Sequence, residues 1–219
     1  MLVQHLGRMP YHQAWTLQQE AHAAVLAGGC ERLLLVEHPP VITFGRRPGA
    51  TRHLLAQPSQ LQAMGVQVVQ SDRGGDVTFH GPGQIVAYPI VRLADHNLSV
   101  GGYVRRLLEV VIATLERFGI VGRIDPAAIG VWVEHEAALR KICALGVRVR
   151  RGVSMHGIAL NVSTDLRWFD LIVPCGLSRP VTSMQQVLGD AAPSMEAVTA
   201  ELTRRMEMVF GQALTVRDN

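Results

Sequence analysis

Lys141 is the only lysine among the 21 Lys and Arg residues of this 219-residue chain. It stands in the stretch ALRKICALGVRVRRG, residues 138–152. An ammonium can give up its proton when its surroundings lower its pKa, whereas a guanidinium stays charged. Chance survival of one lysine in an arginine-rich sequence is the alternative explanation. Lys141 is therefore a candidate acid or base that needs a reacting partner.

Cys175 is the residue that could use such an ammonium. It lies between Pro174 and Gly176 at the end of an apolar run, where a turn can present a thiol to a cleft. The thiolate is the nucleophile, and a nearby cation lowers the thiol pKa from about 8.5. A Cys–Lys dyad is a workable pair of nucleophile and acid/base. The other cysteines, Cys30 and Cys143, are expected to be small buried apolar residues.

A glycine-rich stretch, DRGGDVTFHGPGQ, runs from Asp72 to Gln84. Glycine permits positive φ and close approach of a ligand to the backbone, and such a loop can present several N–H groups to an oxygen or phosphate. Because the stretch also holds Arg73 and His80, a binding role is favoured over a purely structural turn. It matches neither the Gly-Lys-Ser/Thr phosphate loop nor G-x-G-x-x-G.

His156, in SMHGIALNV, is a weaker candidate, because a single histidine in a strand is most often structural. A zinc site made of Cys143, His156 and Cys175 has no support from the ligand spacing. The sequence therefore predicts no metal and no cofactor.

The elements that must position these residues alternate between helix and strand. Apolar periodicity predicts helices over 11–26, 59–64, 103–118 and 194–211. Strands are predicted at 2–6, 32–38, 39–45, 66–70, 84–91, 129–134, 141–150 and 153–162, the last two joined as a hairpin near 151–152. This interleaving predicts one α+β domain over residues 1–219, with a mixed β-sheet flanked by helices rather than a doubly wound parallel sheet.

Composition narrows the class of protein. Apolar residues make up 48% and charged residues 18%, which is typical of a packed globule. The net charge of +3 weakly favours an acidic partner, but there is no basic run of the kind that grips nucleic acid. The densest cluster, RVRRG, alternates with valine and is interpreted as a solvated strand face.

The sequence gives no sign of a membrane or secreted protein. The opening residues do not resemble a signal peptide, and no apolar run is long enough to span a bilayer. Three widely spaced cysteines form no disulfide framework. We therefore expect a cytoplasmic protein with no membrane contact.

Three long segments together resemble one known family. RGGDVTFHGPGQIVAYP, KICALGVRVRRGVSMHGIALNV and PCGL followed by VTS are similar, in order and spacing, to the octanoyl-carrier-protein:protein N-octanoyltransferases of lipoate biosynthesis, over about residues 30–190. The resemblance implies a fold like that of the biotin and lipoate protein ligases. It also implies transfer of an octanoyl group from octanoyl-acyl carrier protein to a lysine of lipoyl domains, namely those of 2-oxoacid dehydrogenase E2 subunits and the glycine cleavage H protein.

The resemblance also implies residue roles. Cys175 matches the nucleophile that forms an acyl-thioester, and Lys141 matches the lysine of the dyad. The predicted substrate-binding residues are Arg73, Gly74, Gly75, Asp76, Val77, Thr78, Phe79, His80, Ala144, Leu145, Gly146, His156, Gly157, Ile158 and Ala159. We expect a monomer that uses no cofactor.

Three other functions fit parts of the pattern. An ATP-dependent lipoate ligase would share the fold but would need no nucleophilic cysteine. A non-catalytic module that binds acyl carriers or lipoyl domains would need neither Lys141 nor Cys175. A thiol hydrolase would pair Cys175 with His80 or His156 and pass the acyl group to water.

Overall fold

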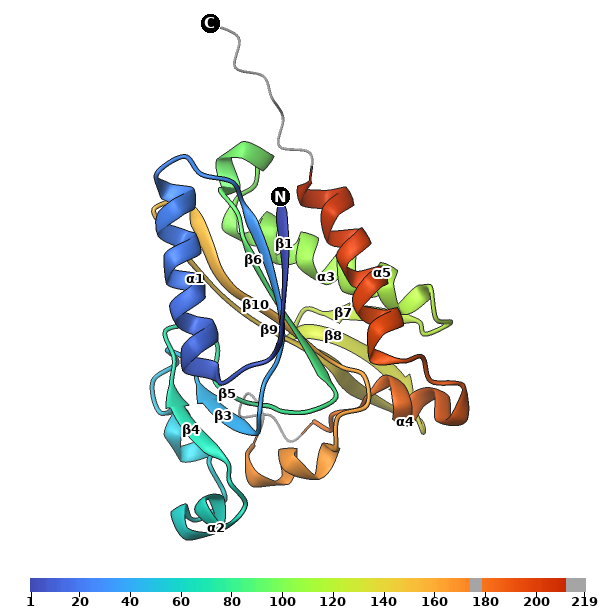
Figure 1. Ribbon diagram of the computed structural model, residues 1–219. Coiled ribbons are helices and arrows are strands. Elements are labelled where there is room, and N and C mark those ends of the chain that lie inside the picture. Colours follow the sequence, from blue (N-terminus) through green and yellow to red (C-terminus); the bar gives the residue numbers. More distant parts are fainter. Residues whose placement is uncertain (174–178, 212–219) are drawn as a thin grey trace, which may run out of the picture.

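A seven-stranded mixed sheet forms the centre of the computed structural model, which describes residues 1–173 and 179–211 (Figure 1). The strand order is β1-β2-β6-β10-β9-β8-β7, with β1 and β2 parallel and the other neighbours antiparallel. The strands are β1 (Leu2–Arg8), β2 (Arg32–Glu37), β6 (Gln84–Ile90), β7 (Gly122–Asp125), β8 (Ala128–His135), β9 (Ala138–Arg150) and β10 (Val153–Asn161). The predicted hairpin of β9 and β10 is confirmed.

Helices cover both faces of this sheet (Figure 1). The helix α1 (Tyr11–Leu26) packs on one face, and α3 (Val100–Glu116) and α5 (Met195–Phe210) pack on the other. Serine side chains cap α3 and α5, since Ser99 and Ser194 each accept a bond from a backbone N–H in the first turn. The short helix α4 (Met184–Leu188) lies between β10 and α5 in sequence.

A second, three-stranded sheet lies beside the first. Its order is β4-β3-β5, with β3 (Val41–Phe44) parallel to β4 (Gln67–Gln70) and antiparallel to β5 (Val77–His80). A separate apolar cluster supports it, built around Phe79, Phe44 and residues of the 3₁₀ turn Leu166–Leu171. The short helix α2 (Pro58–Ala63) and the 3₁₀ turns Ala50–His53 and Leu93–His96 complete the connections.

The structure corrects two expectations. The glycine-rich stretch is not loop throughout, because Val77–His80 forms β5 against β3. Cys30 is exposed rather than buried, because it follows α1 in the turn at Gly28–Gly29. The predicted mixed sheet flanked by helices is confirmed. Within the described residues, no helix is long and apolar enough to cross a membrane.

Candidate functional site

Residues 72–76, which we call the strap, lie across β9. The N–H of Gly74 donates to the carbonyl of Val147 over 2.9 Å. A Cβ at Gly146 would lie 2.8 Å from the carbonyl oxygen of Gly74, so only glycine allows this approach. The strap therefore forms a roof over the hairpin of β9 and β10.

Arg73 fixes the strap to the small sheet. Its Nη2 donates to the carbonyl oxygens of Thr43 (2.6 Å) and Asp76 (2.7 Å), and its Nε donates to Thr43 Oγ1 (3.2 Å). The side chain is buried. Hydrogen bonds to a charged donor are the stronger kind, so Arg73 holds the roof in one position.

Asp72 fixes the other end of the strap to β9 and β10. Its carboxylate pairs with Arg148 and lies 2.6 Å from His156 Nε2. Burial lowers the pKa of His156 to about 3, with further lowering from Arg73 and Arg148, so the ring is neutral. Arg148 is therefore half-buried in an ion pair, and the expectation of a wholly solvated RVRRG face is wrong at this residue.

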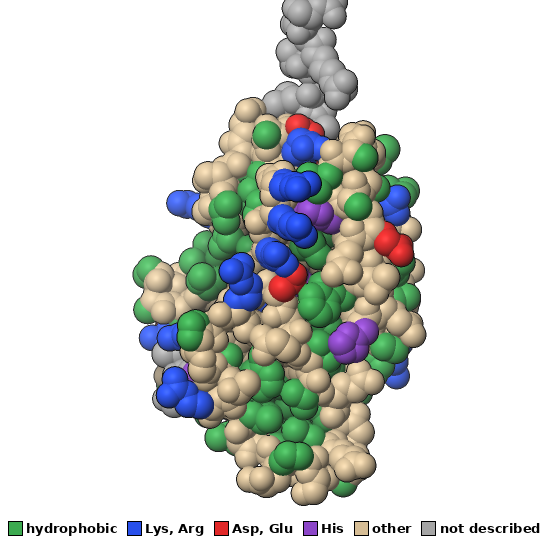
Figure 2. Space-filling view, turned by 90° about the vertical axis from the view of Figure 1, so that its left-hand side faces the viewer, with side chains coloured by type: hydrophobic (Ala, Val, Ile, Leu, Met, Phe, Trp, Pro, Cys, Tyr) green, Lys and Arg blue, Asp and Glu red, His purple; other side chains and the backbone are tan. Residues whose placement is uncertain are grey.

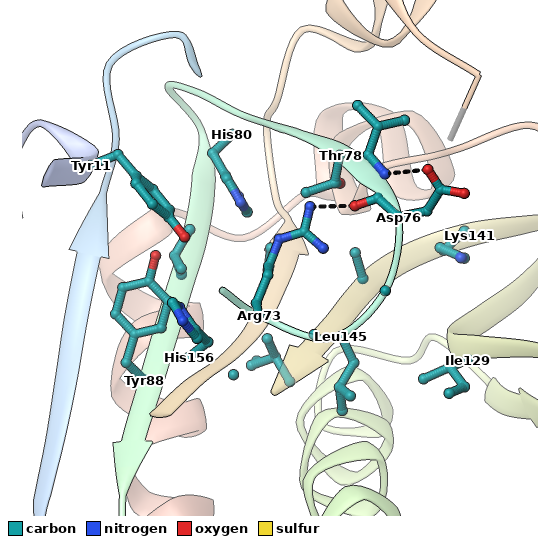
Figure 3. Close-up of a pocket in the computed structure, with 18 residues that line it drawn as sticks. Tyr11, Arg73, Asp76, Thr78, His80, Tyr88, Ile129, Lys141, Leu145 and His156 are labelled. Carbon is teal, nitrogen blue, oxygen red and sulfur yellow. Dashed lines mark hydrogen bonds between the residues drawn. The ribbon is translucent and has the colours of Figure 1, made fainter. Parts of the chain in front are cut away.

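Under the strap lies a pocket. Strands β9 and β10 supply one wall through small residues, among them Ala144, Gly146, Gly157 and Ala159, and β5 supplies another. Figure 3 shows Lys141 and Ile129 on one side of Arg73, and Tyr11, Tyr88, His80 and His156 on the other. The pocket thus has two chemically different ends, which we call the lysine end and the histidine end.

The histidine end consists of buried polar rings. His38 Nε2 lies 2.8 Å from Tyr88 Oη, and His80 Nδ1 lies 2.8 Å from Gln84 Oε1. Burial lowers the pKa of His38 to about 4 and the pKa of His80 well below its usual value. Burial also raises the pKa of Tyr11 and, more strongly, of Tyr88. All these groups are therefore uncharged at pH 7.

The lysine end owes its geometry to a bulge. Val131 pairs with Cys143 but Trp132 pairs with Lys141, so Ile142 is an extra residue in β9. In a regular strand residues 141 and 143 would share a face. Instead Ile142 and Cys143 both enter the core, and Lys141 turns to the pocket.

Two neighbours hold the Lys141 side chain. Its Nζ lies 4.8 Å from the centre of the Trp132 ring, a distance at which an ammonium is attracted by the ring face. Gly130 leaves room for the stem, because a Cβ there would lie 3.2 Å from Lys141 Cε and 2.6 Å from the carbonyl oxygen of Cys143. Lys141 is 6% exposed.

The predicted nucleophile Cys175 lies outside the described residues, but both flanks of its segment are described. On one side, the N–H of Val173 donates to the carbonyl of His53 over 2.8 Å. On the other, the backbone of Lys141 exchanges hydrogen bonds with Pro180 (3.0 Å) and Thr182 (2.9 Å). The described chain after the segment therefore lies beside Lys141, and the chain before it lies beside His53.

Most of the predicted site residues line this one pocket. Lys141 and all but two of the predicted substrate-binding residues do so. Phe79 points away into the cluster under the small sheet, stacked on Trp168 at 5.4 Å, because side chains alternate along β5. Gly74 contacts β9 instead.

Four further residues line the pocket and were not predicted from the sequence: Tyr11, Val86, Tyr88 and Ile129. A signal existed for the tyrosines, since a buried Tyr usually needs a polar partner for its hydroxyl. The Tyr11 hydroxyl is hydrogen-bonded to Ser71 Oγ at 2.8 Å, and the Tyr88 hydroxyl is hydrogen-bonded to His38 Nε2.

Cys143 behaves as the buried apolar residue that the sequence predicted. It is 0% exposed, and burial raises the pKa of its thiol to about 12. It faces the core beneath α3 and α5, whereas His156 faces the pocket on the α1 side. These two side chains therefore cannot share a zinc ion, and within residues 1–173 and 179–211 no three His, Cys, Asp or Glu side chains are grouped to hold a metal.

Comparison with known proteins gives the family. Residues 10–207 match the lipoyl protein ligase A/B catalytic domain. An octanoyltransferase of Roseiflexus sp. (strain RS-1) is 49% identical, covering 96% of this chain and 87% of that protein. An octanoyltransferase of Chloroflexus aurantiacus is 48% identical, covering 96% and 94%.

Solved structures give the same fold at low identity. A bi-partite lipoate protein ligase from Thermoplasma acidophilum superimposes with a TM-score of 0.74 at 15% identity, covering 96% of this chain and 83% of that one. A lipoate-protein ligase A bound with ATP gives 0.73 at 17% identity, covering 96% and 86%. With its sheet, its pocket and relatives at nearly half identity, this chain belongs to the octanoyltransferase family of acyltransferases, within the lipoyl protein ligase A/B catalytic domains.

Proposed function

We propose that residues 1–219 form one catalytic domain that transfers an octanoyl group from octanoyl-acyl carrier protein to a specific lysine of a lipoyl domain. The acceptors are lipoyl domains of 2-oxoacid dehydrogenase E2 subunits and the glycine cleavage H protein. The acyl group passes through a thioester on Cys175, with Lys141 as acid and base. The enzyme acts as a cytoplasmic monomer and uses no cofactor.

The observation that carries this proposal is that the chain just after the Cys175 segment, at Pro180 and Thr182, is hydrogen-bonded to the backbone of Lys141. Cys175 is two residues from Val173 and five from Pro180. Pro180 accepts a hydrogen bond from the backbone N–H of Lys141, so the chain is beside Lys141 five residues after Cys175 in sequence. This short spacing supports the assignment of Cys175 and Lys141 as partners.

The chemistry balances with these two groups alone. The Cys175 thiolate attacks the carbonyl of the carrier's thioester, and the departing thiolate takes a proton from the Lys141 ammonium. The acceptor lysine, as a neutral amine, then attacks the Cys175 thioester. Neutral Lys141 takes the proton that this amine loses, and the Cys175 thiolate leaves. Thioester to amide is downhill, so no ATP enters, and backbone N–H groups near Gly146 and Gly157 are candidates to hold the oxyanion.

The pocket also favours lysine over histidine as the partner of Cys175. His80 is bonded to Gln84, and His156 lies against Asp72. Both stand at the histidine end, across Arg73 from Lys141 (Figure 3). A neutral, partly apolar end suits the alkyl chain, since ligand pockets are mostly apolar with a few polar groups.

Intact mass spectrometry tests the proposal. Incubation with octanoyl-acyl carrier protein, without ATP, should add one octanoyl group to the peptide that contains Cys175. Cys175→Ala should remove the adduct and bring transfer to a lipoyl domain below detection. Cys30→Ala and Cys143→Ala are the matched controls and should keep it. An adduct that persists in Cys175→Ala, or transfer that requires octanoate and ATP, would refute the proposal.

A further inference from the structure

Three arginines, Arg46, Arg47 and Arg52, stand together beside the pocket and are all exposed; we call them the arginine rim. They belong to the connection between β3 and α2. From His38 to Ser71 the sequence contains no aspartate and no glutamate. This part of the chain is therefore positively charged. Figure 2 shows one face of the molecule, on which Lys and Arg side chains outnumber Asp and Glu side chains.

The rim is fastened to the roof of the pocket. The N–H of Arg46 donates to the carbonyl of Arg73 (3.0 Å), and the N–H of Arg47 donates to the carbonyl of Gly75 (3.1 Å). Both acceptors belong to the strap. Arg52 folds back toward the same loop, because Gly49 has positive φ and no side chain in the way. The backbone that carries the rim is thus held at the edge of the roof.

The rim also adjoins the segment that carries Cys175. His53 follows Arg52 directly, and its carbonyl accepts the N–H of Val173 over 2.8 Å. The rim therefore adjoins both the roof of the pocket and Val173, which precedes Cys175 by two residues in sequence.

The nearby acids do not neutralise the rim. Asp76 is 1% exposed and is bound by His53 at 2.8 Å and by Arg47 at 3.5 Å. Asp72 pairs with Arg148 and His156. Among the residues that the structure describes, neither Arg46 nor Arg52 has a carboxylate within 4.0 Å, so at least two positive charges face outward.

We propose that the arginine rim is the docking surface for the acidic carrier protein that donates the acyl group. This inference rests on the proposed function. Acyl carriers are small acidic proteins whose thioester arm is attached through a phosphodiester, and exposed guanidiniums match both carboxylates and phosphate. The rim is thus assigned to the step in which the donor acylates Cys175.

The test is the rate of Cys175 acylation in Arg46→Glu/Arg52→Glu, measured with two donors. With octanoyl-acyl carrier protein at low salt, the second-order rate constant should fall about tenfold, as expected when surface charge steers association. The deficit should shrink as salt rises, because exposed charges are screened beyond about 10 Å at 0.1 M. With the neutral N-acetylcysteamine thioester of octanoate, the rate should change less than about twofold.

Arg117→Glu is the matched control for charge. Arg117 is exposed at the end of α3 on the opposite side of the sheet, and the substitution changes the net charge equally per site. It should leave both donors unaffected. Three results would overturn the rim assignment. Arg117→Glu could slow acylation by the carrier as much as Arg46→Glu/Arg52→Glu does, or the double variant could slow acylation by the neutral donor equally. The third result is that the double variant slows only transfer to the acceptor. A wild-type enzyme that forms no adduct with either donor would instead refute the proposed function.

Discussion

The two ends of the pocket differ in the kind of titratable group that is buried there. At the histidine end, His38, His80 and His156 lose their tendency to take a proton because they are buried. At the lysine end, Lys141 is also buried, yet it lies against the Trp132 ring. The pKa of the nearby Asp125 carboxyl is lowered by hydrogen bonds from Ala127 and Arg179, and to a smaller extent by the charge of Lys141. Burial therefore accompanies neutral histidines at the histidine end, whereas at the lysine end it accompanies a lysine that has an aromatic ring as its neighbour.

This difference suits a substrate with one apolar part and one reacting part. An alkyl chain requires a surface without charge, because a buried unpaired charge is costly. A thioester exchange requires a group that gives and takes a proton. The strap joins the two ends, since Asp72 contacts His156, Arg73 lies between the ends and Asp76 lies toward Lys141 (Figure 3).

Replacing Lys141 by arginine gives the sharpest test of the lysine end. If Lys141 moves a proton, Lys141→Arg should lower transfer to the lipoyl lysine by at least about 100-fold, because a guanidinium keeps its proton. Alkylation of Cys175 should survive in part, because the positive charge that favours its thiolate is retained. Both rates are measured side by side, with Lys141→Ala expected to lose both. Near-normal transfer in Lys141→Arg would reduce Lys141 to an electrostatic role.

Two glycine substitutions in the pocket wall are expected to have different effects, one mainly on the unfolding free energy and the other mainly on the transfer rate. A Cβ at Gly157 would overlap the carbonyl oxygen of Ala87 on β6, so Gly157→Ala should cost about 3 kcal/mol of unfolding free energy. A Cβ at Gly130 would press on the stem of Lys141, and φ there is +139°. Gly130→Ala should therefore lose about tenfold in transfer rate beyond any loss of stability, as displaced catalytic groups do. Urea unfolding and single-turnover transfer measure the two effects.

The buried histidines of the histidine end predict a smaller effect, which is a dependence of the unfolding free energy on pH. His38 and His156 take up protons near pH 4 and 3 in the folded protein, but near pH 6.5 when unfolded. Below about pH 6.5 the unfolded state therefore binds more protons, and each buried histidine lowers the unfolding free energy by up to about 1.4 kcal/mol per pH unit. The unfolding free energy is therefore unaffected by these histidines above pH 6.5 and decreases as the pH falls from 6.5 toward 4.

His38→Gln should flatten that slope, whereas His12→Gln, at an exposed position of α1, should not. Thermal unfolding followed from pH 7 to pH 4 compares the three proteins. An unchanged slope in His38→Gln would mean that the histidine end does not stay neutral on acidification.

The sequence predicted most strands of both sheets but missed β7 and β5. Periodicity located α1 and α5, because each buries one apolar face. The strands β3 and β4 of the small sheet were predicted, but β5 was not, since it has only four residues inside a glycine-rich stretch and pairs with β3, which lies 33 to 39 residues earlier. Likewise Gly101 and Gly102 concealed the start of α3, which the cap at Ser99 specifies.

The site could be predicted as a set of residues but not as a geometry. Alternation along β10 places Ile158 and Leu160 toward α3 and Met155 toward α1. His156 breaks this pattern with φ +57° and lies toward the pocket, as Lys141 does through the bulge at Ile142. Period-two patterns assume regular strands, so they assign the wrong face at irregular positions such as these.

The burial of the single lysine has a consequence for an enzyme that acylates lysines. Every exposed ammonium on its own surface would be a competing acceptor for the activated acyl group. This chain has no other lysine, and Lys141 is 6% exposed. Its solvent-facing cations are arginines, whose guanidiniums remain protonated and do not act as amine nucleophiles. The enzyme surface therefore carries positive charge without offering the acyl group an exposed lysine amine to modify.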